Sequence, residues 1–75
     1  MNLDTAKKQI LELKNRSCHF IYRGSRNQVE EFDGMITKCY SSIFLVKTFD
    51  NTIKTYSYND FIVKNLKIIS CKQRY

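Results

Sequence analysis

The sequence predicts a mainly β fold: a small five-stranded barrel with an N-terminal α-helix and a one-turn helix before the last strand. Three observations predict it. Apolar residues recur at helical spacing near the N-terminus, they follow a period of two from residue 18 onward, and a capping signal at residues 57–60 interrupts the strands. A barrel of this size is filled by its own side chains, so we expect its function on the outer surface.

The first predicted element is a helix over residues 3–14. Its apolar positions lie three or four residues apart and share one face: Leu3, Ala6, Ile10 and Leu13. Leu11 lies beside that face and widens it. We expect the helix to cover one end of the barrel, and the alternative is a contact that reaches beyond the barrel.

The first two strands are predicted from alternation and turn signals. Residues 18–23 alternate with a period of two, which indicates a strand with one face inward. A polar turn follows, and a long second strand is predicted over residues 29–39. Gly34 lies in the middle of that strand, where a small residue usually marks a bend or bulge that helps a sheet to close.

The other three strands are predicted at residues 43–46, 53–56 and 66–71. The first of these is entirely apolar, which indicates a strand covered on both faces. Before the last strand, Ser57 offers the hydroxyl of a helix cap, and Asp60 can accept hydrogen bonds from nearby backbone amides. This order of elements is typical of SH3-like and Sm-like barrels, whose closure removes free strand edges.

Length and composition indicate a single domain, residues 1–75, with the barrel over 17–71. No two of the three cysteines form a C-x-x-C pair, and neither a signal peptide nor an apolar run of membrane-spanning length occurs. We therefore expect reduced, free thiols, a cytoplasmic location and no membrane contact. A core this small gains stability from a staple or from self-association, so a homodimer is expected.

The formal net charge is +6, from thirteen Lys and Arg against seven Asp and Glu. This balance favours anionic partners and does not choose between nucleic acid and acidic proteins, while a lysine-rich genome composition is the alternative explanation. Glu30, Glu31 and Asp33 are expected on a solvated strand face. The alternative for these carboxylates is contact with a basic patch on a second copy.

A candidate binding surface combines a basic loop, with two basic residues near its base, and exposed tyrosines. Its residues are Lys14, Arg16, Arg23, Arg26, Tyr40 and Tyr58. Arginine offers phosphate a planar head with several donors, and bases or peptide prolines stack on tyrosine rings. The alternatives are a solvated loop and, for Tyr58, a place in the core, where we also expect Tyr56.

No catalytic, cofactor or metal site is predicted. The phosphate-binding, dinucleotide-binding and zinc-protease motifs G-x-x-x-x-G-K, G-x-G-x-x-G and H-E-x-x-H do not occur. His19 is the only histidine and is predicted to face outward, whereas Cys18, Cys39 and Cys71 are widely spaced in strands. A zinc site made of these four residues is the remaining alternative, and we expect a protein that is not an enzyme.

Two stretches of the chain give a more specific signal. The first is Gly34, Ile36, Tyr40, Ser42, Phe44 and Val46, and the second is Tyr56, Ser57, Tyr58, Asp60 and Ile62. At these positions the chain resembles the Veg family of small cytosolic proteins of Gram-positive bacteria. The resemblance covers roughly residues 15–70.

That resemblance implies a Sm- or SH3-like barrel with an N-terminal helix. It also implies control of biofilm matrix genes through antagonism of a transcriptional repressor. Three residues depart from the family pattern: Lys38 replaces its Glu, Ser41 its Pro and Lys54 a usual Val. We therefore expect a non-catalytic regulatory binding protein, and the alternative is a nucleic-acid-binding barrel that uses the basic loop and the exposed tyrosines.

Overall fold

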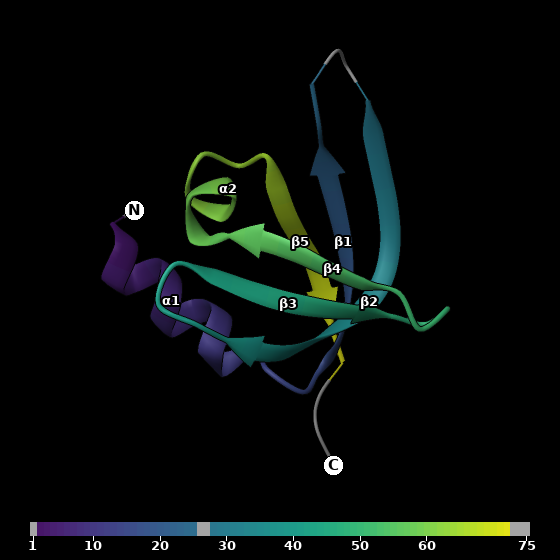
Figure 1. Ribbon diagram of the computed structural model, residues 1–75, viewed down its shortest axis with the longest axis horizontal. Coiled ribbons are helices and arrows are strands. Elements are labelled where there is room, and N and C mark those ends of the chain that lie inside the picture. Colours follow the sequence, from purple (N-terminus) through teal and green to yellow (C-terminus); the bar gives the residue numbers. More distant parts are fainter. Residues whose placement is uncertain (1, 26–27, 73–75) are drawn as a thin grey trace.

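Five antiparallel strands and two short helices make up the computed structural model, which describes residues 2–25 and 28–72 (Figure 1). The elements are α1 (Leu3–Glu12), β1 (Ser17–Arg23), β2 (Val29–Cys39), β3 (Ile43–Thr48), β4 (Ile53–Ser57), α2 (Tyr58–Ile62) and β5 (Leu66–Cys71). Each predicted element is present, and its ends lie within two residues of those predicted. The mainly β class is confirmed.

Local signals fix both ends of α1. The side-chain oxygen of Asn2 accepts a hydrogen bond from the backbone N–H of Thr5 at 2.8 Å, which caps the first turn. Asn15, with φ of 67°, adopts the left-handed conformation that ends a helix. The buried face of α1 carries Ala6 and Ile10, and the helix contacts α2 and β2.

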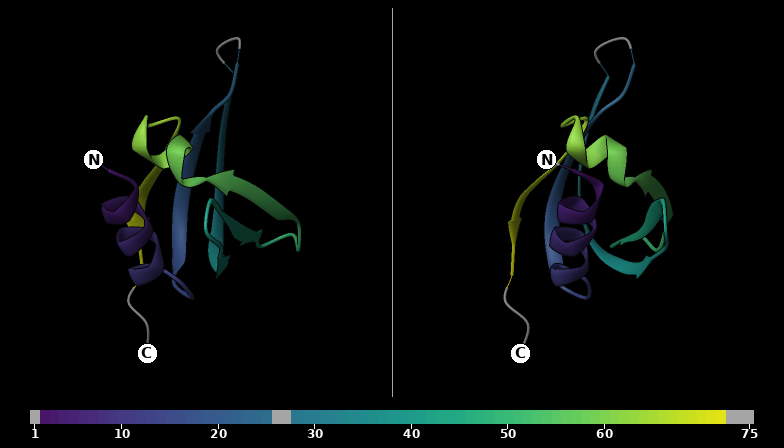
Figure 2. Two further views of the ribbon diagram at one scale, coloured as in Figure 1. Left: turned by 60° about the vertical axis from the view of Figure 1, so that its left-hand side comes forward. Right: turned by 90° about the vertical axis from the view of Figure 1, so that its left-hand side faces the viewer.

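The sheet has the strand order β4-β3-β2-β1-β5, which leaves β4 and β5 as its two edges. No ladder joins these edges among the described residues, so the predicted closure into a barrel is not confirmed. The sheet is nevertheless strongly curved, and the end-on view in Figure 2 places β5 on one side of α1 and the β3–β4 hairpin on the other. The short helix α2 lies between the edges and contacts both β4 and β5.

Only the inner face of the sheet is covered. The core is formed by ten buried side chains: Ala6, Ile10, Cys18, Phe20, Ile36, Phe44, Val46, Tyr56, Tyr58 and Leu66. In β3, Phe44 and Val46 are fully buried, whereas Ile43 is 37% exposed and Leu45 is half-buried. The prediction that this strand is covered on both faces is wrong, because both helices pack on the inner side of the sheet.

Gly34 has a different role from the one predicted. It pairs regularly with both neighbouring strands, and the register shift of β2 lies instead between Ile36 and Lys38. A Cβ atom at Gly34 would lie 2.9 Å from the carbonyl oxygen of Lys47 and 2.9 Å from Cγ1 of Val46. A hydrogen atom in place of a side chain therefore allows β3 to approach β2 closely at this point.

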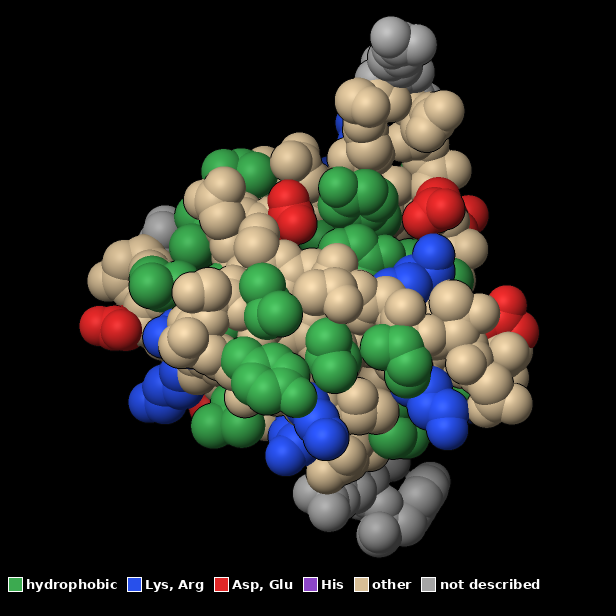
Figure 3. Space-filling view, in the orientation of Figure 1, with side chains coloured by type: hydrophobic (Ala, Val, Ile, Leu, Met, Phe, Trp, Pro, Cys, Tyr) green, Lys and Arg blue, Asp and Glu red, His purple; other side chains and the backbone are tan. Residues whose placement is uncertain are grey.

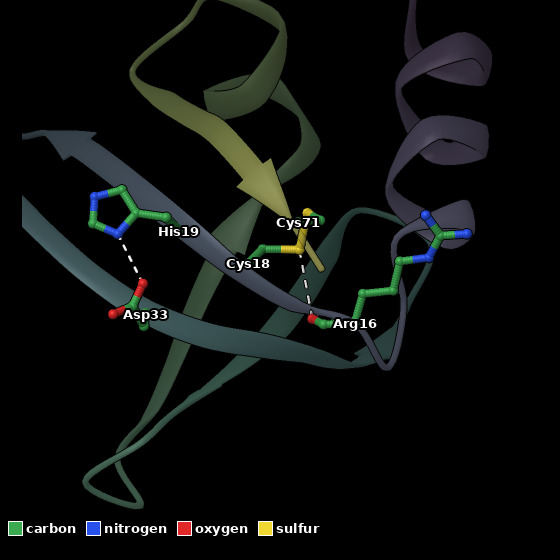
Figure 4. The surroundings of a disulfide bond; sticks show 5 residues. All are labelled: Arg16, Cys18, His19, Asp33 and Cys71. Carbon is green, nitrogen blue, oxygen red and sulfur yellow. Dashed lines mark hydrogen bonds and ion pairs between the residues drawn. A yellow bond between two sulfur atoms is a disulfide. The ribbon is translucent and has the colours of Figure 1, made fainter. Parts of the chain in front are cut away.

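Cys18 and Cys71 form a disulfide, although the sequence led us to expect free thiols (Figure 4). The two residues are 53 positions apart and lie opposite one another where β1 pairs with β5. Sequence spacing could not show this pairing, because it depends on which strand the last strand joins. Of the three cysteines, Cys39 is free.

We predict that removal of this disulfide lowers the free energy of unfolding by up to about 4 kcal/mol, the chain-entropy value for a loop of this length. Urea unfolding of the wild type should therefore show a lower midpoint in dithiothreitol, and the double variant Cys18→Ser, Cys71→Ser should match the reduced protein. Cys39→Ser is the control and should keep the oxidised midpoint. Equal midpoints with and without reductant would contradict the prediction.

Gly34→Ala should destabilise the fold by about 1–3 kcal/mol, because the added methyl group meets a backbone carbonyl that cannot move away easily. Gly24→Ala is the matched control, since a Cβ there would lie 3.6 Å from its nearest neighbour, an ordinary contact. Chemical denaturation of the two variants under identical conditions measures the difference. Equal stability of the two variants would show that the close approach of β3 to β2 does not require glycine at position 34.

Candidate binding surfaces

The predicted basic residues do not form one cluster. Lys14 and Arg16 lie half-buried in the connection between α1 and β1, and Arg23 is exposed at the opposite end of β1. Seven residues of extended chain separate these ends by about 20 Å. The expectation that Lys14 and Arg16 lie near the base of the basic loop is therefore wrong, while Arg26 lies outside the described residues.

The predicted tyrosine platform is not formed either. Tyr58 is 2% exposed, and its hydroxyl donates a 2.7 Å hydrogen bond to the carbonyl oxygen of Tyr40. Burial raises the pKa of Tyr58, and burial followed by the Glu30 charge raises the pKa of Tyr56 to about 12. Tyr56 lies in the core as predicted. Of Tyr40, Tyr56 and Tyr58, Tyr40 alone is exposed, at 50%.

The turn from β4 into α2 is held by reciprocal hydrogen bonds, as the sequence predicts. Ser57 Oγ accepts from the backbone N–H of Asp60 at 3.1 Å, and Asp60 Oδ2 accepts from the backbone N–H of Ser57 at 3.3 Å. Asp60 is therefore a structural residue. Both tyrosines that flank Ser57 point into the core, so this part of the chain serves the fold.

His19 lies on the outer side of β1, as predicted, opposite Asp33 in β2 (Figure 4). Its Nδ1 is 2.8 Å from Asp33 Oδ1, and its Nε2 is 3.5 Å from Glu31 Oε1. Glu31 and Asp33 share this face, whereas Glu30 lies on the other face of β2 with its carboxylate 3.4 Å from Lys54 Nζ, so the prediction of one face for all three carboxylates is wrong. In residues 2–25 and 28–72 no group of three His, Cys, Asp or Glu side chains could hold a metal ion.

We predict that His19 titrates above its ordinary pKa of 6.5, chiefly because Asp33 hydrogen-bonds its protonated ring. A raised folded-state pKa means that this pair stabilises the fold fully below pH 6.5. The contribution is lost as the pH rises through the folded-state pKa. An NMR titration of the imidazole should show the raised pKa, with a large decrease in Asp33→Asn and a smaller one in Glu31→Gln. An unchanged midpoint in Asp33→Asn would refute the assignment.

Apolar side chains gather on the outside of the β3–β4 hairpin. The apolar residues of this surface, here called the β3–β4 outer face, are Tyr40, Ile43, Leu45 and Ile53, of which Ile53 is 53% exposed. The exposed Lys38 and Lys47 lie on the same face, opposite Leu45 and Ile53. Figure 3 shows hydrophobic side chains gathered over this side of the molecule, with Lys and Arg side chains along the lower border. The sequence signal for this surface is the uninterrupted apolar run at residues 43–46. That run predicts a strand covered on both faces, but the outer face of β3 is open.

A second apolar surface lies along the free edge of the sheet. The α2–β5 groove has a volume of about 480 Å³ and is lined by Phe61, Ile62, Lys64, Leu66, Lys67, Ile68 and Ile69. It lies where α2 meets the edge strand β5, so its walls come from a helix and a strand that are adjacent in sequence. The sequence predicts a strand over residues 66–71 but not this groove, because a groove depends on how the strand packs against α2.

The fold and these surfaces define a class: a small, mainly β protein built on one curved antiparallel sheet, with apolar side chains left on its outside. No described helix is long and apolar enough to cross a membrane. The chain belongs to the Veg family, because the family model for "Biofilm formation stimulator VEG" matches residues 1–69. No curated protein and no solved structure matches it.

Proposed function

We propose that the chain is a non-catalytic regulatory binding protein that acts on a transcriptional regulator through protein–protein contacts and so influences biofilm matrix genes. Membership of a family described as biofilm formation stimulators supports this proposal. The observation that carries it is the apolar surface, on the β3–β4 outer face and in the α2–β5 groove, that no other described part of the chain covers. Apolar surface of this kind favours association with another protein.

We infer as well that two copies associate through the β3–β4 outer face. Phe44 and Val46 fill the inner side of β3 while Ile43 and Leu45 point to the other side, so a second copy would give this strand the two-sided cover that its sequence is typical of. A twofold-symmetric contact uses the same patch on both copies and needs no second complementary surface.

Sedimentation at two loadings tests the dimer. The wild type should have a mass near two chains at high micromolar concentration. Ile53→Lys should shift it toward one chain, because the variant loses an apolar side chain of the contact and adds a second positive charge beside Lys47. Val29→Lys is the control, since Val29 is equally exposed at 56% but lies at the start of β2. A wild-type mass of one chain, or the same shift in both variants, would refute the arrangement.

A protein partner and a nucleic acid are distinguished by their salt dependence. Phosphate-driven binding weakens steeply with salt, with a log–log slope of about −0.9 per phosphate contact on duplex DNA. We expect labelled DNA and RNA to show no micromolar binding at either of two salt concentrations, because Arg23 lies far from Lys14 and Arg16. Salt-sensitive binding that weakens in the double variant Arg23→Ala, Arg26→Ala would favour the nucleic-acid alternative.

Affinity capture from the native cytosol tests the regulator itself. We expect the wild-type chain to retain one transcriptional regulator reproducibly, and a reconstituted pair of purified proteins to bind in the same assay. Capture with ample bait that yields no such regulator would end the proposal. The cytoplasm is the proposed location, and there thiol reductants act on exposed disulfides.

We further infer that the curved sheet is an open form of the SH3-like or Sm-like barrel. The order of the elements supports this inference, as does the place of α2, which contacts both edge strands where a barrel would pair them. In an experimental structure, a continuous ladder between β4 and β5 would show a closed barrel, and a flat sheet would show no barrel, so either result would contradict this inference.

A further inference from the structure

We propose that the α2–β5 groove binds a short, acidic and apolar segment of a protein partner. The inference rests on the proposed function and deepens it, since it assigns the regulator's contact to one place on the surface. This place is distinct from the β3–β4 outer face: β5 and β4 are opposite edges of the sheet.

The floor of the groove is apolar. Phe61 and Ile62 come from α2, and Leu66, Ile68 and Ile69 come from β5. Ile68 and Ser70 pair with consecutive residues of β1, so Ile69 is an extra residue without a partner in the ladder. As a result Ile69 is 54% exposed beside the buried Leu66, and a volume of about 480 Å³ accommodates several apolar side chains of a partner.

The rim of the groove is positively charged. Lys64 and Lys67 line it together with the apolar residues, and no Asp or Glu side chain does. Neither lysine forms an ion pair with any other residue of the described chain. A partner that fills the apolar floor and carries carboxylates at its margins therefore complements the groove in both respects, whereas a nucleic acid would leave the isoleucines without a matching contact.

The backbone at Lys64 adds an independent argument. Within residues 2–25 and 28–72, three non-glycine residues have a positive φ: Asn15, Asn51 and Lys64, the last with φ of 67°. Asparagine adopts this left-handed conformation readily, but lysine does not, and glycine is the usual residue just after a helix. A lysine kept in an unfavourable conformation at the rim of a groove points to a role for its charge rather than for its backbone.

This conformation separates binding from stability. Lys64→Gly removes the charge and also relieves the backbone, so its melting temperature should equal or exceed that of the wild type. The same variant should bind an acidic partner at least threefold more weakly. A residue that acted only in folding would not give this opposite pair of changes.

The test uses the full isotopically labelled chain and two synthetic peptides, one of alternating aspartate and leucine and one of alternating lysine and leucine. The acidic peptide should produce saturable NMR shifts confined to α2 and β5, and the basic peptide none. Lys64→Gly should weaken that binding as above, and Ile69→Ser should weaken it at least tenfold. Lys38→Ala, which removes an exposed lysine of β2, is the control and should leave the affinity unchanged.

Several outcomes would overturn the proposal: no saturable shifts, shifts outside α2 and β5, equal binding of both peptides, or an unaltered affinity in Lys64→Gly. Loss of a dimer in Ile69→Ser would overturn it too, since the occupant would then be a second copy. If the peptide binds here but no regulator is captured, the groove stands and the proposed function fails. If Ile69→Ser captures a regulator as well as the wild type does, the proposed function stands and the groove is not the regulator's contact.

Discussion

The position of α2 depends on one buried side chain, Tyr58. Its hydroxyl donates to the carbonyl oxygen of Tyr40, its backbone N–H donates to the carbonyl oxygen of Ser42 at 3.2 Å, and its ring lies in the core beside Phe44. These contacts join the start of α2 to the turn between β2 and β3. The helix is thereby held in contact with both edge strands, and the groove forms where it meets β5.

Four of the residues on which the resemblance to the family rests serve the fold. Tyr56 and Tyr58 are buried, and Ser57 and Asp60 cap α2, so none of these four side chains is available to contact a partner. Residues that depart from the family pattern lie elsewhere. Lys38 and Ser41 are exposed next to the β3–β4 outer face, and Lys54 pairs with Glu30 while its ammonium lies 5.2 Å from the centre of the Phe32 ring.

Sequence reasoning succeeded where the cause is local. Alternation located the strands, and Ser57 with Asp60 located α2, because a capping box acts within four residues. It failed where the cause is a contact between distant segments. The Cys18–Cys71 disulfide and the close approach at Gly34 each depend on which strands become neighbours. For the same reason the two candidate binding surfaces could not be predicted from the sequence. An apolar residue in a strand does not show whether another element packs against its face. The separation of Arg23 from Lys14 and Arg16, by contrast, follows from the extended length of β1, which the sequence already predicts.

The two proposed surfaces differ in what maintains them. The β3–β4 outer face belongs to a hairpin paired over its whole length, with β2 as a further neighbour. The α2–β5 groove depends on an edge strand that has β1 as its one paired neighbour and a bulge at Ile69, and the disulfide at Cys71 fastens the end of that strand. In a reducing compartment the ladder and the contacts of α2 must hold β5 without the covalent bond. Reduction therefore removes a covalent tie from the edge that carries the groove, whereas the contacts between β3 and β4 involve no disulfide.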